Sequence, residues 1–255
     1  MPGSASPTRP GQGEFDAVAQ YYDHLMRTVP YAGWVDYVEA LVRRWKSHPR
    51  QVLDLACGTG RVGSEMLRRG YDVTGADLSE PMVRECAKQA PPLTAVVSDA
   101  GQLALADESF DLVVCLYDSL NYLLEPQQFC GAMAEAHRVL RRNGLLVFDM
   151  NTIRALSTAM FTQASMSGPD PLHYDWHAYW DPWTRLCRVE MWFGYHAPEG
   201  VREFCETHYQ RAYTSREIAG ALEAAGFRRH KSYDAYRFTP VTPWTDRAYY
   251  VARKE

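Results

Sequence analysis

The chain has 255 residues, of which 46% are hydrophobic, and a formal net charge of −4. This length admits one large α/β domain or two small ones, and the hydrophobic fraction is sufficient for a packed core. The negative charge and the lack of a Lys/Arg block argue against a DNA partner. No apolar run approaches the length of a membrane span, so we expect no membrane partner.

Residues 1–13 are rich in Pro, Gly and Ser and predict a flexible tail. They contain no apolar core of a secretory signal. The six cysteines form no C-x-x-C pair. This pattern indicates reduced, buried thiols in a cytoplasmic protein and predicts no metal site.

Helical spacing of apolar residues begins near Phe15, and a second helix is predicted at residues 34–45. Short apolar runs then alternate with helical segments. The predicted strands lie at residues 51–57, 71–77, 93–97, 110–118 and 145–151. The predicted helices lie at residues 62–69, after an N-cap at Ser79, and at 126–140. This alternation is typical of βαβ units in a parallel sheet.

The alternation stops after Asn151. Residues 152–171 are polar and irregular, with weak helical character. Residues 185–196 and 202–213 alternate apolar and polar side chains around an APEG turn, which predicts an antiparallel hairpin. We interpret the region of about 155–213 as an inserted antiparallel β lid.

A capping box at Thr214 and Glu217 then predicts a helix over residues 218–225. Residues 229–238 and 247–254 predict two antiparallel strands, because the segment between them is too short for a crossover helix. The expected fold is α/β: a Rossmann-like, doubly wound, seven-stranded mixed sheet whose last strand is antiparallel. Residues 14–255 would form one domain that carries the lid.

The loop after the first strand spells G-x-G-x-x-G with Gly58, Gly60 and Gly63, and Asp77 ends the next strand. Such a loop lets backbone approach a nucleotide-type cofactor, and the acid fits ribose hydroxyls. NAD proteins share both features. Here, however, Asp54 lies inside the first strand and favours a ligand with an amino group or positive charge. Asp99 ends the third strand, where it can accept from an adenine amino group, and the terminal strand pair is unusual for an NAD domain.

With DLACGTG, Asp77, Asp99 and the segment RVLRRNGLLVFDMN in these positions, the chain resembles the class I S-adenosylmethionine-dependent methyltransferases over residues 15–255. Asn143 and Gly144 stand where many relatives have two glycines. The resemblance implies S-adenosylmethionine as cofactor and S-adenosylhomocysteine as product. It also implies cofactor-binding roles for Tyr22, Asp54, Ala56, Gly58, Thr59, Gly60, Asp77, Leu78, Met82, Asp99, Ala100, Leu116 and Tyr117.

Within that set, the resemblance places the glycines under the methionine part and the acids on ribose and adenine. Leu78 and Met82 would pack on the adenine, although a core position suits Met82 equally well. Leu116 and Tyr117 would line the sulfonium side. Tyr22 would close over the cofactor or pack as an ordinary helix residue.

The region after the fourth strand reads LYDSLNYL and lacks the N/D-P-P-Y/F/W motif of enzymes that methylate base amines. We therefore expect a small-molecule acceptor. The predicted catalytic residues are His208 as a base, Asp118 as an amine anchor, and Asn121. His208 could instead be a strand histidine bonded to a neighbour, and Asp118 a helix cap. Further acceptor candidates are Asn151, Tyr209 and Arg211.

Aromatic residues crowd the start of the insertion, at Tyr174, Trp176, Tyr179, Trp180 and Trp183. They could form an amine pocket, the core of the lid, or a homodimer contact. The leading hypothesis is in-line methyl transfer to a nitrogen or oxygen of a small molecule. The alternatives are a tRNA base or protein acceptor, an NAD-linked oxidoreductase, and a non-catalytic cofactor-binding protein.

Overall fold

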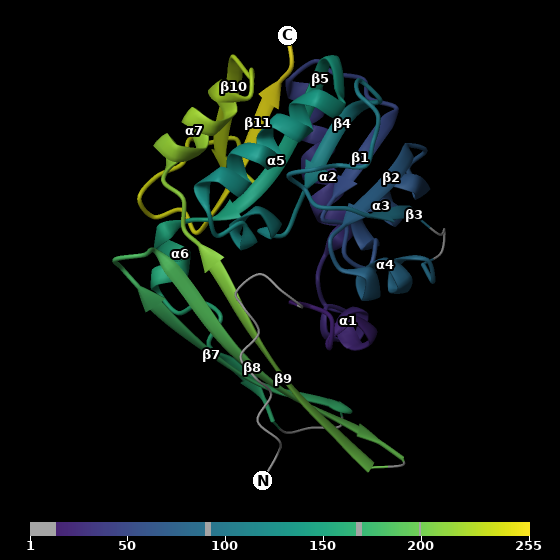
Figure 1. Ribbon diagram of the computed structural model, residues 1–255, viewed down its shortest axis with the longest axis vertical. Coiled ribbons are helices and arrows are strands. Elements are labelled where there is room, and N and C mark those ends of the chain that lie inside the picture. Colours follow the sequence, from purple (N-terminus) through teal and green to yellow (C-terminus); the bar gives the residue numbers. More distant parts are fainter. Residues whose placement is uncertain (1–13, 90–92, 167–169, 199) are drawn as a thin grey trace.

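The computed structural model describes residues 14–89, 93–166, 170–198 and 200–255 (Figure 1). The expected flexible tail, residues 1–13, lies outside the described residues. Two sheets dominate: a twisted sheet flanked by helices, and a second sheet of long strands that projects from one end of it (Figure 1).

The first sheet has seven strands in the order β10-β11-β5-β4-β1-β2-β3. Neighbouring strands from β1 to β5 pair in parallel, whereas β11 is antiparallel to both β5 and β10. The predicted mixed sheet with an antiparallel last strand is therefore confirmed. Its strands are β1 Gln51–Leu55, β2 Asp72–Asp77, β3 Thr94–Val97, β4 Phe110–Cys115, β5 Leu140–Asn151, β10 Arg229–Asp234 and β11 Arg247–Arg253.

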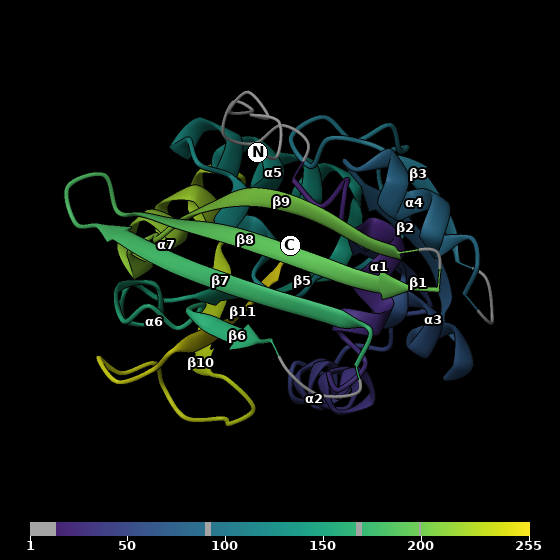
Figure 2. The same cartoon turned by 90° about the horizontal axis from the view of Figure 1, so that it is seen from below.

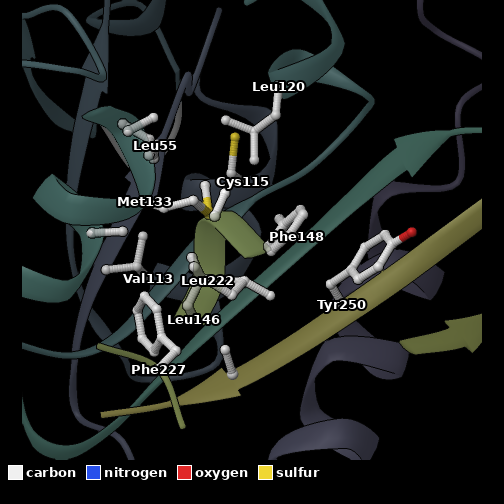
Figure 3. Packing of buried hydrophobic residues seen from close by; sticks show 14 of the residues in the cluster. Leu55, Val113, Cys115, Leu120, Met133, Leu146, Phe148, Leu222, Phe227 and Tyr250 are labelled. Atoms are coloured by element: carbon white, nitrogen blue, oxygen red, sulfur yellow. The ribbon is translucent and has the colours of Figure 1, made fainter. Parts of the chain in front are cut away.

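Helices cover both faces of this sheet, because its central strands are apolar on both sides. In β4, Val113 and Cys115 pack toward α5 and α7 (Figure 3), while Leu112 and Val114 pack toward α2 and α3. The helices are α1 Ala19–Leu25, α2 Tyr31–Arg44, α3 Arg61–Arg68, α4 Glu80–Cys86, the short 3-10 helix η1 Ser119–Tyr122, α5 Pro126–Val139, α6 Ile153–Ser157 and α7 Ser215–Ala224.

Two predicted helix starts have their capping contacts. The Ser79 hydroxyl accepts the Met82 N–H at the start of α4, at 3.3 Å. Thr214 and Glu217 form the reciprocal capping box of α7. Both contacts satisfy backbone donors that a helix N-terminus leaves free.

The start of β5 differs from the prediction. The strand begins at Leu140, directly after α5, rather than after a turn at Asn143 and Gly144. Its pairing with β4 shifts register between Phe110 and Leu112, and Asn143 takes a positive φ of 66°. The expected turn is thus a bulge inside a longer strand.

The second sheet, which we call the lid sheet, has the antiparallel order β6-β7-β8-β9. Its strands are β6 Gln163–Ser165, β7 Leu172–Asp181, β8 Leu186–Ala197 and β9 Gly200–Arg211. The predicted hairpin corresponds to β8 and β9. The strand β7 was not predicted. Large aromatic residues occupy both of its faces, so its sequence lacks the apolar–polar alternation of a half-buried strand.

The lid sheet spreads across one end of the molecule (Figure 2), and α1 lies between it and the first sheet (Figure 1). A hydrophobic cluster joins the two parts, with Val18 and Tyr21 from the α1 region, Met82 from α4 and Met191 and Phe193 from β8. In the part of the chain that the structure describes, no helix is both long enough and apolar enough to cross a membrane.

Candidate active site

A cavity of about 780 Å³ lies between the carboxyl ends of β1, β2 and β4, the segment around α1, and the lid sheet. Ligand sites commonly enclose about 300–1,000 Å³, so both a nucleotide-type cofactor and a small acceptor fit. Open α/β sheets bind ligands at this edge, outside the carboxyl ends of their strands.

The glycine loop follows β1 and turns sharply, with positive φ at Ala56, Gly58 and Gly60. The Gly58 N–H donates to Asp77 Oδ2 at 2.7 Å, so the acid at the end of β2 shapes the loop. Gly60 serves a different purpose from the one expected. It lies outside the lining formed by the described residues, and a Cβ there would come within 2.4 Å of Cys86 Sγ. Gly60 therefore permits close packing of the loop on α4.

The other residues proposed for cofactor binding meet at the cavity. Its lining includes Tyr22, Asp54, Ala56, Gly58, Thr59, Asp77, Leu78, Met82, Asp99, Ala100, Leu116 and Tyr117. Leu78 is 63% exposed, whereas Met82 is almost fully buried and also belongs to the cluster that joins α4 to the lid sheet. Thus Leu78 offers a free apolar face and Met82 a packed one.

Asp54 is buried at the cavity wall, and its Oδ2 accepts the Gly63 N–H at 2.8 Å. Burial raises the pKa of this carboxyl to about 7, although the Gly63 hydrogen bond acts in the opposite direction. Burial also raises the pKa of Asp77, against the hydrogen bonds from Ser79 and Gly58. Two desolvated acids beside one loop form a place where a cation is stabilised.

On the lid side, the buried face of β9 is polar. Glu206, His208 and Gln210 alternate along the strand, and all three are buried. They stand opposite the apolar residues Met191, Val189 and Cys187 of β8, respectively. Buried polar groups are costly unless hydrogen-bonded. We call these three residues the polar row.

His208 lines the cavity and is held on both ring nitrogens. Its Nε2 lies 2.8 Å from Glu206 Oε2, and its Nδ1 lies 3.2 Å from the Tyr122 hydroxyl. The Phe15 ring packs edge-on at 4.5 Å between centroids. The pairing with Glu206 bears out the neighbour-bonded alternative, and the cavity position keeps the base hypothesis open.

Asp118 also borders the cavity, but both of its oxygens are engaged. Oδ1 accepts from Arg247 at 2.7 Å, and Oδ2 accepts from Gln210 at 2.6 Å. Burial raises the pKa of Asp118, while Arg247 opposes the shift. Arg247 also pairs with Asp149. Asp118 is thus a member of a buried ion-pair network rather than a free amine anchor.

The prediction of Asn121 as a catalytic residue is corrected by its position. Asn121 lies outside the cavity lining that the described residues form. Its side-chain amide donates to the carbonyls of Asn151 and Arg211, at 3.1 and 2.9 Å, and its Oδ1 accepts the Asn151 N–H at 2.9 Å. Because these contacts tie β5 to β9, the role of Asn121 is to fasten the lid sheet.

Sequence reasoning missed Tyr122 and Arg247, which both line the cavity. Tyr122 lies within LYDSLNYL, where an aromatic hydroxyl next to the predicted acceptor residues was the available signal. Arg247 lies 129 residues from its partner Asp118, and no local pattern connects the two. Of the remaining acceptor candidates, Asn151 donates to Gln210, and Arg211 packs over Tyr213.

The aromatic residues at the start of the lid sheet fall into a buried group and an exposed group. Tyr174, Trp176 and Trp180 pack into the core beneath the lid sheet, and Trp176 reaches the cavity. Tyr179 is 47% exposed and Trp183 is 93% exposed. The cluster is therefore partly lid core and partly free surface.

Comparisons with known proteins agree with this geometry. A family model described as a methyltransferase domain matches residues 52–144. The Bacillus subtilis (strain 168) protein YqeM, provisionally named a methyltransferase, is 28% identical over 243 residues, covering 94% of this chain and 97% of its own. A Streptomyces venezuelae dTDP-3-amino-3,4,6-trideoxy-alpha-D-glucopyranose N,N-dimethyltransferase is 26% identical over 213 residues, covering 82% of this chain and 90% of its own.

Among solved structures, an S-adenosylmethionine-dependent methyltransferase from Clostridium acetobutylicum ATCC 824 superposes with a TM-score of 0.80. It is 24% identical and covers 94% of this chain and 98% of its own. The similarity extends over the lid sheet as well as the first sheet. The matched residues 52–144 form a methyltransferase domain that contains the glycine loop and both acidic strand ends, and the protein is an S-adenosylmethionine-dependent methyltransferase.

Proposed function

We propose that this enzyme methylates an amine nitrogen of a small molecule, with the Tyr122–His208 pair receiving the proton that the nitrogen loses. One observation carries the proposal. Among the described lining residues, carboxylates outnumber arginines by seven to two: Glu14, Asp16, Asp54, Asp77, Glu80, Asp99 and Asp118 against Arg61 and Arg247.

Ion pairs engage both arginines, Arg247 with Asp118 and Asp149 and Arg61 with Asp23 at 3.7 Å. Asp118 is engaged in the same way, and Glu80 pairs with Arg84, so five of the seven lining acids lie outside these ion pairs. The cavity is therefore acidic and favours cationic over anionic ligands. This balance supports a protonated amine acceptor and argues against the tRNA alternative, which would require a basic cleft. The Streptomyces venezuelae relative is itself named as an N,N-dimethyltransferase of an amino sugar.

The residues present fit the cofactor. Asp77 and Asp99 would accept from its ribose and adenine, and Leu78 and Met82 would pack on the adenine. The buried acid Asp54 would face its ammonium group, which would draw the pKa of Asp54 down from about 7. When bound, S-adenosylmethionine would supply an electrophilic methyl group for in-line displacement by the nitrogen lone pair, with S-adenosylhomocysteine as the product.

An ammonium ion has no lone pair, so the acceptor must lose a proton before it attacks. Burial raises the pKa of Tyr122 well above its usual range, so its hydroxyl stays protonated. That hydroxyl can donate to His208 Nδ1 while it accepts from the amine, which transfers one proton to the imidazole. Trp176, Met191 and Phe193 would form the apolar wall around the acceptor.

A methyl-transfer screen tests the proposal. The protein is incubated with methyl-labelled S-adenosylmethionine and matched amines, alcohols and carboxylates that share one carbon skeleton, and products are detected by mass spectrometry. We expect N-methylated products and S-adenosylhomocysteine. Methylation of the alcohols alone, or of tRNA added in a parallel reaction, would contradict the amine assignment.

Two further predictions concern the setting of the enzyme. We propose a cytoplasmic location, which cell fractionation would test.

We also propose a homodimer through the exposed lid aromatics Tyr179 and Trp183. Light scattering of the Trp183→Ser variant, which should remain folded and become monomeric, tests that contact.

A further inference from the structure

Glu206 connects two elements that are far apart in the sequence. Its Oε1 accepts the backbone N–H groups of Ala17 and Val18, at 2.9 and 3.0 Å. Its Oε2 faces His208 Nε2 at 2.8 Å. The Glu206 side chain is only 5% exposed and that of His208 only 1%. One buried carboxylate therefore holds both the residues that lead into α1 and the proposed base.

These contacts determine where the protons of His208 lie. As a carboxylate, Glu206 can only accept hydrogen bonds, and its Oε1 already accepts two backbone N–H groups. Nε2 of His208 must then carry a hydrogen, and in the neutral ring Nδ1 is left as the acceptor. Nδ1 is the nitrogen that meets the Tyr122 hydroxyl. Glu206 thus selects the tautomer in which His208 can accept a proton through Tyr122.

The other charged groups near the His208 ring contact partners other than the imidazole. Asp118 pairs with Arg247 behind Gln210, and Glu14 accepts the Tyr209 N–H at 3.2 Å. Glu206 is consequently the carboxylate in direct contact with the imidazole.

The segment held by Glu206 also contacts the cofactor side of the cavity. Asp23 accepts from the Thr59 hydroxyl at 2.6 Å and from the Gln89 side chain at 2.7 Å. Asp16 accepts from the Ser79 hydroxyl at 2.7 Å. Thr59 belongs to the glycine loop, and Ser79 caps α4. The position of α1 therefore depends on the elements that bind the cofactor.

We propose that Glu206 is a positioning residue that couples the docking of α1 over the cofactor to the tautomer of His208. When α1 is docked, its backbone donors orient Glu206 so that Oε2 holds the Nε2–H form. When α1 moves away to admit ligands, the carboxylate loses both donors and that tautomer is no longer enforced. This inference rests on the proposed function of His208 as the base.

The test uses the full-length protein, 15N-labelled at histidine, with S-adenosylhomocysteine as the ligand. Long-range 1H–15N spectra report the imidazole tautomer, and His208→Gln assigns the signal. Hydrogen exchange over residues 17–25 reports the docking of α1. We expect the wild type to show the Nε2–H tautomer and S-adenosylhomocysteine to slow exchange in α1.

In Glu206→Gln, the amide oxygen should stay with the two backbone donors, so its NH₂ faces His208 and the ring should switch to the Nδ1–H tautomer. Glu203→Gln, an exposed acid on the same strand, is the matched control and should keep the wild-type spectrum. An unchanged tautomer in Glu206→Gln would overturn the inference.

A second variant leaves the polar row intact. Ala17→Pro removes one backbone donor at an exposed residue, and we expect exchange in α1 to rise about tenfold, with a mixture of His208 tautomers. Faster exchange with a pure Nε2–H signal would show that docking and tautomer are independent. Neither readout needs an acceptor, so failure of the amine screen alone would overturn the proposed function and leave this coupling standing.

Discussion

The two sides of the cavity are built in different ways. On the cofactor side, the polar contacts join residues close in sequence: Asp54 to Gly63, nine residues apart, and Gly58 to Asp77, nineteen apart. On the lid side, Glu206 meets Val18 across 188 residues, and Arg247 meets Asp118 across 129. The cofactor side is a local strand–loop–helix unit, whereas the lid side forms only when distant segments of the chain come together on folding.

The two sides also differ in charge. The cofactor side keeps desolvated acids, Asp54 and Asp77; burial raises their pKa values, and a bound cation would stabilise their ionised forms. The lid side engages its polar groups internally, as Glu206 with His208 and Asp118 with Arg247. Substitutions on the cofactor side should therefore act mainly on ligand affinity, and substitutions on the lid side mainly on turnover or stability.

The largest effect is expected for His208→Gln. The glutamine amide can still donate toward Glu206 but cannot take a proton, so kcat should fall by about 10²–10⁴-fold. The affinity for S-adenosylhomocysteine, measured by calorimetry, should stay at the wild-type value. His230→Gln, a partly exposed histidine on β10, serves as the control. Unchanged turnover in His208→Gln would contradict the role of His208 as a base and leave the polar row with a structural role.

Arg247→Met tests the ion-pair network. The variant leaves Asp118 and Asp149 buried without their cation, so the free energy of unfolding should drop by about 3–5 kcal/mol. Denaturant titration measures this loss, with the exposed Arg216→Met as control. A loss no larger than that of the control would mean that Asp118 and Asp149 do not depend on Arg247.

The same contrast explains what the sequence could predict. The seven-stranded sheet and the cofactor-side residues followed from glycine spacing, strand-end acids and alternating elements, because these signals lie within one or two elements of each other. Gly60 was assigned to the cavity because sequence cannot distinguish a glycine needed for a ligand from one needed for Cys86.

The lid side was predicted only in part. His208 was selected by its side-chain chemistry, whereas Tyr122 and Arg247 depend on chain segments that meet only after folding. Asn121 looked like a site residue because it follows a strand end, yet its amide is used entirely by β5 and β9 backbone. The strand β7 escaped notice because a run of aromatic residues conceals which side chains alternate inward.

Asp77→Ala addresses the cofactor side. Removing a carboxylate that would accept from both ribose hydroxyls should weaken S-adenosylhomocysteine binding by about 2–4 kcal/mol. Calorimetric titration checks this value. Asp72→Ala, at the exposed start of the same strand, should bind normally. Wild-type affinity in Asp77→Ala would contradict the ribose assignment and leave Asp77 only its contacts with Gly58 and Ser79.

Asp54→Asn should show the smallest change, and its sign depends on pH. The pKa of Asp54 is raised from 3.8 to about 7 in the folded protein, so the folded state holds an extra proton between these values. Its contribution to stability therefore decreases as pH rises through this window, and above pH 7 a buried carboxylate must be ionised. Asparagine avoids that cost and can still accept the Gly63 N–H.

The ligand-free Asp54→Asn variant should consequently be more stable than the wild type at pH 8, by roughly 1–3 kcal/mol, because burial of its own amide offsets part of the gain. The difference should vanish near pH 3, well below the folded pKa of about 7, where Asp54 is mostly neutral in both the folded and the unfolded state. S-Adenosylhomocysteine should bind the variant more weakly at pH 8, since the neutral amide cannot pair with the ammonium group. Thermal unfolding at both pH values, with and without this ligand, measures the two effects together. A variant that gains stability and keeps full affinity would show that Asp54 does not face the cofactor, and the cofactor side would then depend on Asp77 and Asp99 alone.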